Sequence, residues 1–320
     1  MAQEDALTYL RHGQTPFFRL PVSVGLVPPG TRAVLLGVPT DLGATYQPGA
    51  RLAPWHVRRV SALVQGYHPA HGIDVFAEVN AVDGGNVAFP PFSAPAMRDA
   101  VEVEVAAVAA AGAVPFVVGG DHSLTLPVLR ALSARHGPLA VVHVDAHLDT
   151  SGPETWGEPF HHGTPFRHAL AEGLVAPGAL FQVGIRGPWG SAADPALTRA
   201  HSGRIVSADE VGERGAAALG AELRAALGAR PTYLTFDVDA LDPAFAPGTG
   251  TPVPGGITSR EAFALLRALA GAAVVGMDVV EVAPALDQGD RTSALAAHLL
   301  YEGLALLALA GRRGGPDRSG

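Results

Sequence analysis

Short apolar runs alternate with longer stretches of helical character along most of this chain. The apolar runs have the length and composition of buried strands and lie at 32–38, 114–118, 139–144, 179–184, 203–207, 231–236 and 273–279. The stretches of helical character lie at 54–64, 96–111, 124–136, 215–228, 258–270 and 292–310. Strands that alternate with helices in this way predict an α/β fold, with a parallel sheet covered on both faces by helices.

The pattern also separates an arm and a tail from one long domain. Residues 1–30 form an irregular N-terminal arm, because glycines and prolines interrupt any regular element. Phe17 and Phe18 would be costly to expose, so we expect this arm to pack on the body of the protein or on a neighbouring subunit. Residues 31–311 show no internal repeat and no dividing linker and form a single domain. The Gly- and Arg-rich residues 312–320 are expected to be a disordered tail.

Composition narrows the classes of function. Hydrophobic residues make up 48% of the 320-residue chain and charged residues 16%, which predicts a substantial core. The net charge of −8 argues against a nucleic-acid binder and against an anionic-membrane binder. The chain has no cysteine and no lysine, which excludes disulfides, thiolate chemistry and lysine Schiff bases. No uninterrupted apolar run reaches the roughly 20 residues of a membrane span, and residues 1–10 do not resemble a signal peptide, so we expect a cytoplasmic protein.

Five short segments carry carboxylates and histidines, and most of them follow a strand-like run. They are Gly119–Ser123, Asp145–Asp149, His161–Thr164, Asp237–Asp239 and Val280–Val282. Active sites of open parallel sheets form outside the carboxyl ends of the strands. The segments together hold more oxygen and nitrogen donors than one divalent cation needs, so they predict a site for two metal ions.

The spacing within two of these segments supports a metal site. In Asp145-x-His147-x-Asp149 and in Asp237-x-Asp239, side chains two positions apart share one face of an extended segment and can converge. A lone Asp-x-Asp is more often an exposed turn, but two such clusters at predicted strand ends favour metal ligands.

Other polar residues nearby are assigned supporting parts. No nucleophile elbow surrounds Ser123, so we interpret it as a helix cap or a supporting group rather than a nucleophile. Asp121 and His143 are likewise interpreted as groups that orient ligands or fill the core. The Gly- and Pro-rich stretch 242–256 follows the acidic pair and is expected to form a pocket wall or lid.

Three of the segments resemble the signatures of the ureohydrolases, the arginase/agmatinase family. These are Gly119–Ser123, Asp145–Asp149 and Phe236–Pro243, and the similarity runs in order from about Val34 to Tyr301. Further segments resemble the agmatinase and guanidinobutyrase branch more than arginase itself. They are Tyr46–Arg51, His162–Phe166, Gly184–Arg186 and Ala246–Pro252.

The resemblance implies a three-layer α/β/α fold with a mainly parallel eight-stranded sheet, and two Mn²⁺ ions per subunit. By the same resemblance, one Mn²⁺ is bound by His122, Asp145, Asp149 and Asp237, and the other by His147, Asp145, Asp237 and Asp239. Asp145 and Asp237 would then bridge the two ions. All of these ligand positions are present in this sequence, and the family also implies a homotrimer or homohexamer.

The resemblance assigns the remaining two segments to the substrate and to catalysis. Glu281 matches the family glutamate that pairs with the substrate guanidinium, and His162 matches a histidine that assists proton transfer or orientation. Two cations that share a water molecule lower its pKa and supply a nucleophile for the guanidinium carbon. The expected products are urea and an amine.

By this resemblance we expect the substrate to be a small linear guanidino compound, with agmatine, which gives putrescine for polyamine biosynthesis, as the first candidate. Trp156 and Glu158 lie in the loop where the tail of the substrate should pass, and a carboxylate there favours a cationic tail. Arg51 or Arg186 could instead favour an anionic tail, as in 4-guanidinobutanoate or 3-guanidinopropanoate.

Two alternatives belong to other classes. A single-zinc deacylase of the histone-deacetylase type has a related fold but does not need Asp149 and Asp239 as further carboxylate ligands. A non-catalytic regulator is expected to lose metal ligands or Glu281, and this chain keeps all of them.

Overall fold

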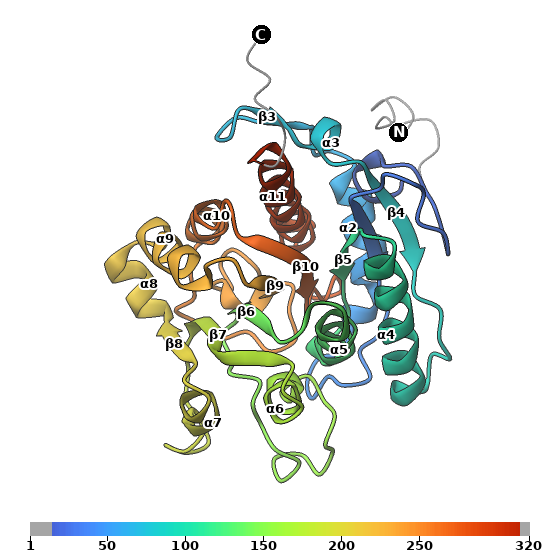
Figure 1. Cartoon of the computed structure of the whole chain (residues 1–320). Coiled ribbons are helices and arrows are strands. Elements are labelled where there is room, and N and C mark those ends of the chain that lie inside the picture. The colour runs from blue at the N-terminus through green and yellow to red at the C-terminus, as the bar shows by residue number, and fades with distance from the viewer. Residues whose placement is uncertain (1–14, 314–320) are drawn as a thin grey trace.

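Eight parallel strands form one sheet at the centre of the molecule, between two layers of helices (Figure 1). The computed structural model describes residues 15–313. In sheet order the strands are β4 (Ala81–Asn86), β1 (Ala33–Gly37), β5 (Val114–Val118), β10 (Ala273–Val280), β9 (Pro231–Asp237), β6 (Leu139–Val144), β7 (Val175–Ile185) and β8 (Arg204–Ser207). Every pair of neighbours in this sheet is parallel. The predicted three-layer α/β/α fold with an eight-stranded sheet is confirmed.

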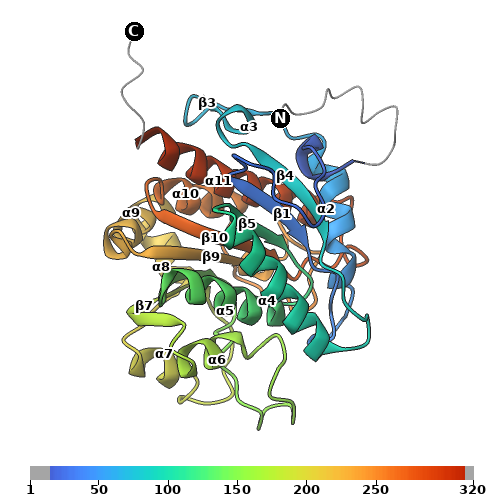
Figure 2. The same ribbon diagram turned by 45° about the vertical axis from the view of Figure 1, so that its right-hand side comes forward.

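Alternate residues of each strand feed two hydrophobic cores, one on each face of the sheet. In β1, Leu35 belongs to one core, whereas Val34 and Leu36 belong to the other. The helices over the first core are α2 (Ala53–Ser61), α3 (Val75–Glu78), α8 (Ala208–Arg214), α9 (Ala216–Leu227), α10 (Ser259–Ala268) and α11 (Arg291–Arg313). Those over the second core are α4 (Ala94–Ala110), α5 (Thr125–His136) and α6 (Pro165–Ala171). Figure 2 shows the sheet between α10 and α11 on one side and α4 and α5 on the other.

The sequence pattern predicts seven of the eight strands and misses β4. Only Ala81 and Val82 of this strand are apolar, and Asp83 and two glycines follow them. The Asp83 carboxylate is nevertheless buried, because Arg58 Nε donates to its Oδ2 at 2.8 Å and Arg58 Nη2 to its Oδ1 at 3.0 Å. β4 is thus the last strand of the sheet, held by β1, by the Arg58 ion pair and by an isolated parallel bridge between Asp83 and Val22.

The described part of the N-terminal arm packs on the body of the same chain. Phe17 and Phe18, in a short 3₁₀ helix, are fully buried. The backbone N–H of Phe17 donates to Asp83 Oδ2, and that of Phe18 donates to Ser61 Oγ, both at 2.8 Å. Residues 1–14 of the predicted arm lie outside the described residues.

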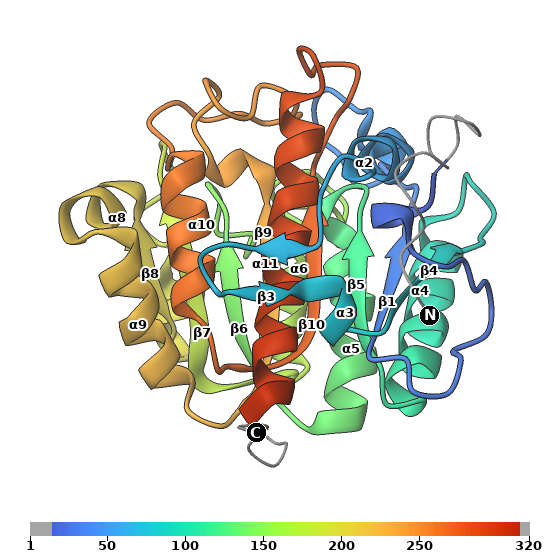
Figure 3. The same ribbon diagram turned by 90° about the horizontal axis from the view of Figure 1, so that it is seen from above.

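Helix α11 runs along the first core and continues into the predicted tail. Arg312 is still helical, and its Nη2 pairs with Glu78 Oε1 at 2.6 Å, so the prediction of a tail from residue 312 is wrong at its first positions. Residues 314–320 lie outside the described part of the chain. By length and composition alone, residues 291–312 could cross a membrane, but 67% of the most apolar window is buried inside the protein. Figure 3 shows α11 beside α10, lying over the strands.

The sheet order places four candidate segments side by side. β5, β10, β9 and β6 are consecutive in the sheet, and each is followed by one of the segments rich in carboxylate or histidine. Because all four strands are parallel, these segments emerge at the same edge of the sheet.

Candidate metal centre

His122 reaches the edge of the sheet through a turn that only glycine permits. A Cβ on Gly120 would lie 2.1 Å from the carbonyl oxygen of Thr40, which excludes any side chain at this position. The chain then enters a short 3₁₀ helix, His122–Leu124, whose N-cap is Asp121, with its Oδ1 accepting from the backbone N–H of Ser123 at 2.9 Å. The cap is therefore Asp121 and not Ser123, which the sequence had suggested.

The Asp145 carboxylate lies between two imidazoles. Its Oδ2 is 3.2 Å from His122 Nδ1, and its Oδ1 is 3.4 Å from His147 Nδ1. The side chain is fully buried directly after β6. One oxygen facing each histidine is the arrangement that a carboxylate bridging two cations needs.

Each imidazole faces further carboxylates. His122 Nδ1 lies 2.9 Å from Asp149 Oδ2 and 3.4 Å from Asp237 Oδ2. His147 Nδ1 lies 3.1 Å from Asp239 Oδ2. The sequence-predicted ligands are thus gathered in one place, in two groups that share Asp145.

A shell of neutral polar groups, which the sequence did not reveal, supports these side chains. His122 Nε2 lies 2.9 Å from Thr235 Oγ1 of β9. Gln182 Nε2 of β7 donates to His143 Nδ1 at 3.0 Å, which leaves the proton of that ring on Nε2, 2.6 Å from Asp145 Oδ2. His143 therefore orients a ligand, in line with the supporting part predicted for it.

The centre concentrates negative charge where water cannot screen it. Burial raises the pKa of Asp237 well above its usual range, and the charges of Asp239 and Asp145 raise it further. Burial alone would lower the pKa of His122, but the carboxylates around it outweigh this effect and hold its pKa well above the usual value. The pKa of His147 is raised to about 12, because the attraction of Asp239 and Asp145 exceeds the effect of burial. A buried group of this charge calls for cations.

The chemistry of the donors fits divalent metal ions. His122 Nδ1 is fully buried and makes no hydrogen bond within the described part of the chain, although it faces three carboxylate oxygens. An imidazole nitrogen so placed is a ligand atom that lacks its partner. Carboxylate oxygens with imidazole nitrogens suit Mn²⁺ and similar ions.

Glu281 and His162 form a pair beside this centre. His162 Nδ1 donates to Glu281 Oε1 at 2.9 Å, and the same oxygen accepts from the backbone N–H of His122 at 2.9 Å. His162 Nε2 lies 2.8 Å from Thr45 Oγ1. Burial would lower the pKa of His162, but the Glu281 carboxylate outweighs it and raises this pKa to about 9. Burial raises the pKa of Glu281 itself.

Two residues of the site have backbones in the left-handed region. Asp149 has φ 51° and Glu281 has φ 64°. This conformation costs a residue with a side chain on the order of 1–3 kcal/mol, and the surrounding fold must hold it. Backbone strain of this kind is common at functional sites. Here the strained conformations direct the Asp149 carboxylate toward His122 and the Glu281 carboxylate toward His162.

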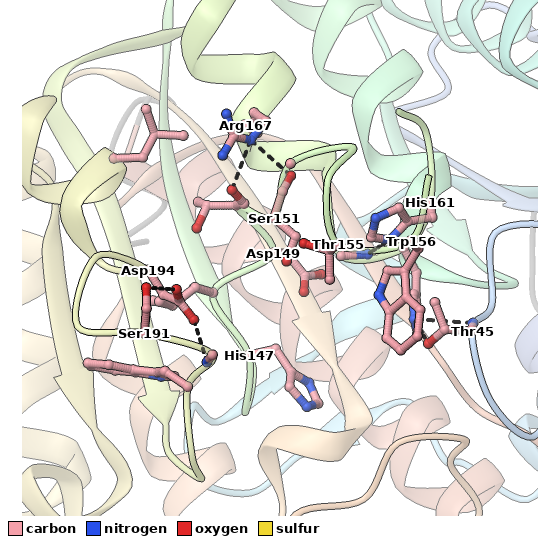
Figure 4. A pocket seen from close by; sticks show the side chains of 18 of the residues that line it. Thr45, His147, Asp149, Ser151, Thr155, Trp156, His161, Arg167, Ser191 and Asp194 are labelled. Carbon is pink, nitrogen blue, oxygen red and sulfur yellow. Dashed lines mark hydrogen bonds between the residues drawn. The ribbon is translucent and has the colours of Figure 1, made fainter. Parts of the chain in front are cut away.

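The centre opens into a cavity of about 830 Å³. His147, Asp149 and His162 are among the residues that line it, and so is Trp156 (Figure 4). Glu158, the other residue predicted to meet the substrate, is not among the lining residues, and its carboxylate accepts from the backbone N–H of Phe160 at 3.1 Å. Trp156 thus remains a candidate for substrate contact, whereas Glu158 points elsewhere.

The two arginines that could have bound an anionic tail are already engaged. Arg51 Nε donates to Asp41 Oδ1 at 2.5 Å, and this residue does not line the cavity. Arg186 does line it, but its guanidinium donates to backbone carbonyls, among them those of Asp239 at 2.7 Å and Ala240 at 3.0 Å.

A further arginine, which also lines the cavity, was not found from the sequence. Arg167 Nε donates to the carbonyls of Thr150 and Ser151 at 3.1 and 2.9 Å (Figure 4). Its terminal Nη2 lies 3.7 Å from Glu154 Oε1. No sequence motif marks this residue, since its place depends on how α6 packs against the loop that follows β6.

The chain is similar in sequence and in structure to known proteins. Residues 31–305 match the model of the Arginase family. Proclavaminate amidinohydrolase of Streptomyces clavuligerus is 44% identical, over 94% of this chain and 97% of that protein. Its solved structure superimposes with a TM-score of 0.87, at 44% identity and covering 94% of this chain and 99% of that one.

Relatives of similar closeness carry different names. Guanidinopropionase of Pseudomonas aeruginosa is 44% identical over 95% of both chains. Mitochondrial agmatinase of Gallus gallus is 40% identical over 92% of this chain and 86% of its own length.

Proposed function

The chain belongs to the arginase family, and we propose that it hydrolyses a linear guanidino compound to urea and an amine. The observation that carries this proposal is Asp145, whose two oxygens face His122 and His147, beside a cavity that His147, Asp149 and Asp237 line. Relatives named amidinohydrolase, guanidinopropionase and agmatinase support the reaction class.

The proposed cofactor is a pair of Mn²⁺ ions. One ion would be held by His122, Asp145, Asp149 and Asp237, and the other by His147, Asp145, Asp237 and Asp239. In support, the Nδ1 atom of each histidine lies within 3.4 Å of carboxylate oxygens from its own set. When bound, such a pair lowers the pKa of water and so supplies a nucleophile at neutral pH.

The residues of the chain orient the substrate and move the proton. The Glu281 carboxylate accepts from a guanidinium N–H and holds the guanidinium carbon beside the metal ligands. His162, with a pKa of about 9, carries a proton at neutral pH and can give it to the amine nitrogen as the C–N bond breaks. The backbone N–H of His122 and the hydroxyl of Thr45 fix the positions of these two side chains.

Agmatine is the first candidate substrate. The carboxylates of Glu154 and Asp194 lie on the cavity wall and favour a cationic tail, and neither Arg51 nor Arg186 is free to bind an anionic one. A guanidino acid is the second candidate, because within residues 15–313 the terminal nitrogens of Arg167 face only the Glu154 carboxylate, at 3.7 Å.

A urea-release assay with Mn²⁺ tests the proposal. The panel holds agmatine, 4-guanidinobutanoate, 3-guanidinopropanoate and arginine, with formimidoylglutamate, which would release formamide, as a further substrate. We expect urea from agmatine above all others. Absence of both urea and formamide across the panel would refute the function, whereas preference for a guanidino acid would change only the substrate.

The alternatives of other classes fit the geometry less well. A single-zinc deacylase has no use for Asp149 and Asp239, yet each of them lies close to one of the two histidines. Metal content of the first centre separates the cases, because a single tightly held zinc ion there, with no place for a second ion, would favour the deacylase. The cytoplasmic location and the homotrimer or homohexamer stay proposals.

A further inference from the structure

A second group of histidines lies in the β-hairpin of β2 (Tyr67–His68) and β3 (Ile73–Asp74). His68 ends the first strand, and His71 lies in the turn. The backbone N–H groups of His71 and Gly72 both donate to the carbonyl of His68, at 3.3 and 2.8 Å, so the turn holds the two histidines together. Their ring centroids are 4.4 Å apart.

The hairpin lies across helix α11 (Figure 3). His68 Nε2 lies 3.0 Å from Glu302 Oε2, and the His68 ring stacks on that of Tyr301 with centroids 5.5 Å apart. Tyr301 Oη also donates to the carbonyl of Gly66 at 2.8 Å. These contacts bring the buried Glu302 carboxylate of α11, the buried His68 ring and the half-buried His71 ring into one cluster.

Two ring nitrogens of this cluster are buried without a partner. Within the described residues, neither His68 Nδ1 nor His71 Nε2 makes a hydrogen bond. His122 Nδ1, at the proposed manganese centre, has the same property. Buried polar atoms rarely remain unpaired in native proteins, so the unpaired nitrogens make this cluster a candidate place for a ligand.

We propose that His68, His71 and Glu302 bind a divalent cation of the Zn²⁺ type at this second place. Each of the three offers a ligand atom, and these atoms lie within 4.8 Å of one another. Two imidazoles with one carboxylate are a ligand set that zinc takes in proteins, with water at the open position. In the described structure none of the three residues lines the cavity of the first centre.

The His68–Glu302 contact prepares His68 for this role. His68 Nε2 and Glu302 Oε2 lie 3.0 Å apart, a spacing at which one cation can take both atoms as ligands, much as His122 Nδ1 and Asp149 Oδ2 lie 2.9 Å apart at the first centre. A cation here would join the hairpin to α11 at the surface of the first core.

The positive charge of Arg267, beside Glu302, provides a second way to test the proposal. Its Nε and Nη2 donate to Glu302 Oε1 at 2.8 and 2.5 Å and leave Oε2 to the His68 side. The positive charge weakens binding of a second cation nearby. Removal of this charge should therefore strengthen zinc binding, whereas a purely structural ion-pair network would only lose a contact.

The metal content of full-length protein tests the proposal without reference to activity. The protein is saturated with Mn²⁺, incubated with Zn²⁺ and dialysed, and the zinc per chain is measured by plasma mass spectrometry. Zinc that replaces manganese at the first centre contributes equally to every sample. We expect His71→Ala to hold one zinc ion per chain fewer than the wild type. His136→Ala, which removes an exposed histidine at the end of α5, should match the wild type.

Two further variants keep the test decisive. Arg267→Met should bind zinc several-fold more tightly than the wild type, and zinc should raise its melting temperature more. His71→Gln, which keeps a polar side chain in the turn, serves if His71→Ala does not fold. Equal zinc content in the wild type and a folded His71 variant would overturn the proposal, as would unchanged or weaker binding by Arg267→Met.

Discussion

Asp145 owes its orientation to a chain of buried hydrogen bonds that begins outside the metal centre. Thr198 Oγ1 donates to Gln182 Oε1 at 2.6 Å, and Gln182 Nε2 donates to His143. The His143 ring then faces Asp145 at 2.6 Å. All four side chains are buried, so water does not compete for these hydrogen bonds. The bonds therefore fix the orientation of the Asp145 carboxylate, with one oxygen toward each of the two imidazoles.

The first prediction concerns the middle of this chain. Gln182→Leu removes the donor that fixes the His143 tautomer and should weaken Mn²⁺ binding about 10–100-fold, the usual effect of such supporting groups. The Mn²⁺ concentration needed for half-maximal activity measures it. Thr198→Val, which leaves the Gln182–His143 contact in place, should have a smaller effect. An unchanged Mn²⁺ requirement in Gln182→Leu would show that the chain does not orient Asp145.

The second prediction concerns pH. Glu281 raises the pKa of His162 to about 9, so the proton on this ring is present below that pH and is lost as the pH rises through it. If this proton goes to the leaving amine, kcat should fall on the alkaline side with an inflection near pH 9. A pH profile of kcat at saturating Mn²⁺ checks this, with His162→Asn as the control. The same inflection in that variant would assign the titration to another group.

At the scale of elements, the sequence predicts buried strands well and edge elements poorly. Strands such as β6 and β9 are near-continuous apolar runs because helices cover both faces, and the ligands follow at their ends. β4 escaped notice because Asp83 and two glycines interrupt its apolar run. The supporting roles of Gln182 and Thr235 were not predicted for another reason. Their contacts depend on which strands are neighbours in the sheet, and no local sequence pattern indicates that order.

The third prediction tests how β4 and the arm are held. Asp83→Ala leaves the Arg58 guanidinium and the Phe17 N–H without their buried partner and should lower the free energy of unfolding by about 3–5 kcal/mol. Chemical denaturation measures the change. Ser93→Ala removes only the N-cap of α4 and should cost about 1 kcal/mol. A loss in Asp83→Ala no larger than that of Ser93→Ala would mean that the pair does not fasten the edge.

At the scale of the whole molecule, the two faces of the sheet build the cores and one edge carries the chemistry. The alternation of strands and helices predicted this architecture, because a parallel sheet must be covered on both faces. The cavity was less predictable, since segments far apart in the chain form its walls, among them those of Thr45, Arg167 and Thr251. The hairpin cluster of His68, His71 and Glu302 lies outside that cavity and can be altered independently.

The fourth prediction concerns Asp237, the carboxylate that is proposed to bind both cations. Asp237→Asn removes a buried carboxylate that faces His122 and is proposed to bridge both cations. The variant should lose Mn²⁺ and nearly all turnover, with its fold retained by circular dichroism. Thr251→Val, at the hydroxyl that lies 3.3 Å from Asp239, should keep both metal ions.

Urea release measured against manganese bound per chain tests the proposed two-manganese hydrolysis most directly. Apo protein is titrated with Mn²⁺, and the rate with each guanidino substrate is recorded at each metal content. We expect activity to rise to its maximum only as the second ion binds, and we expect Asp237→Asn to reach neither that metal content nor that rate. Full activity with a single bound ion, or no urea from any substrate with two, would contradict it.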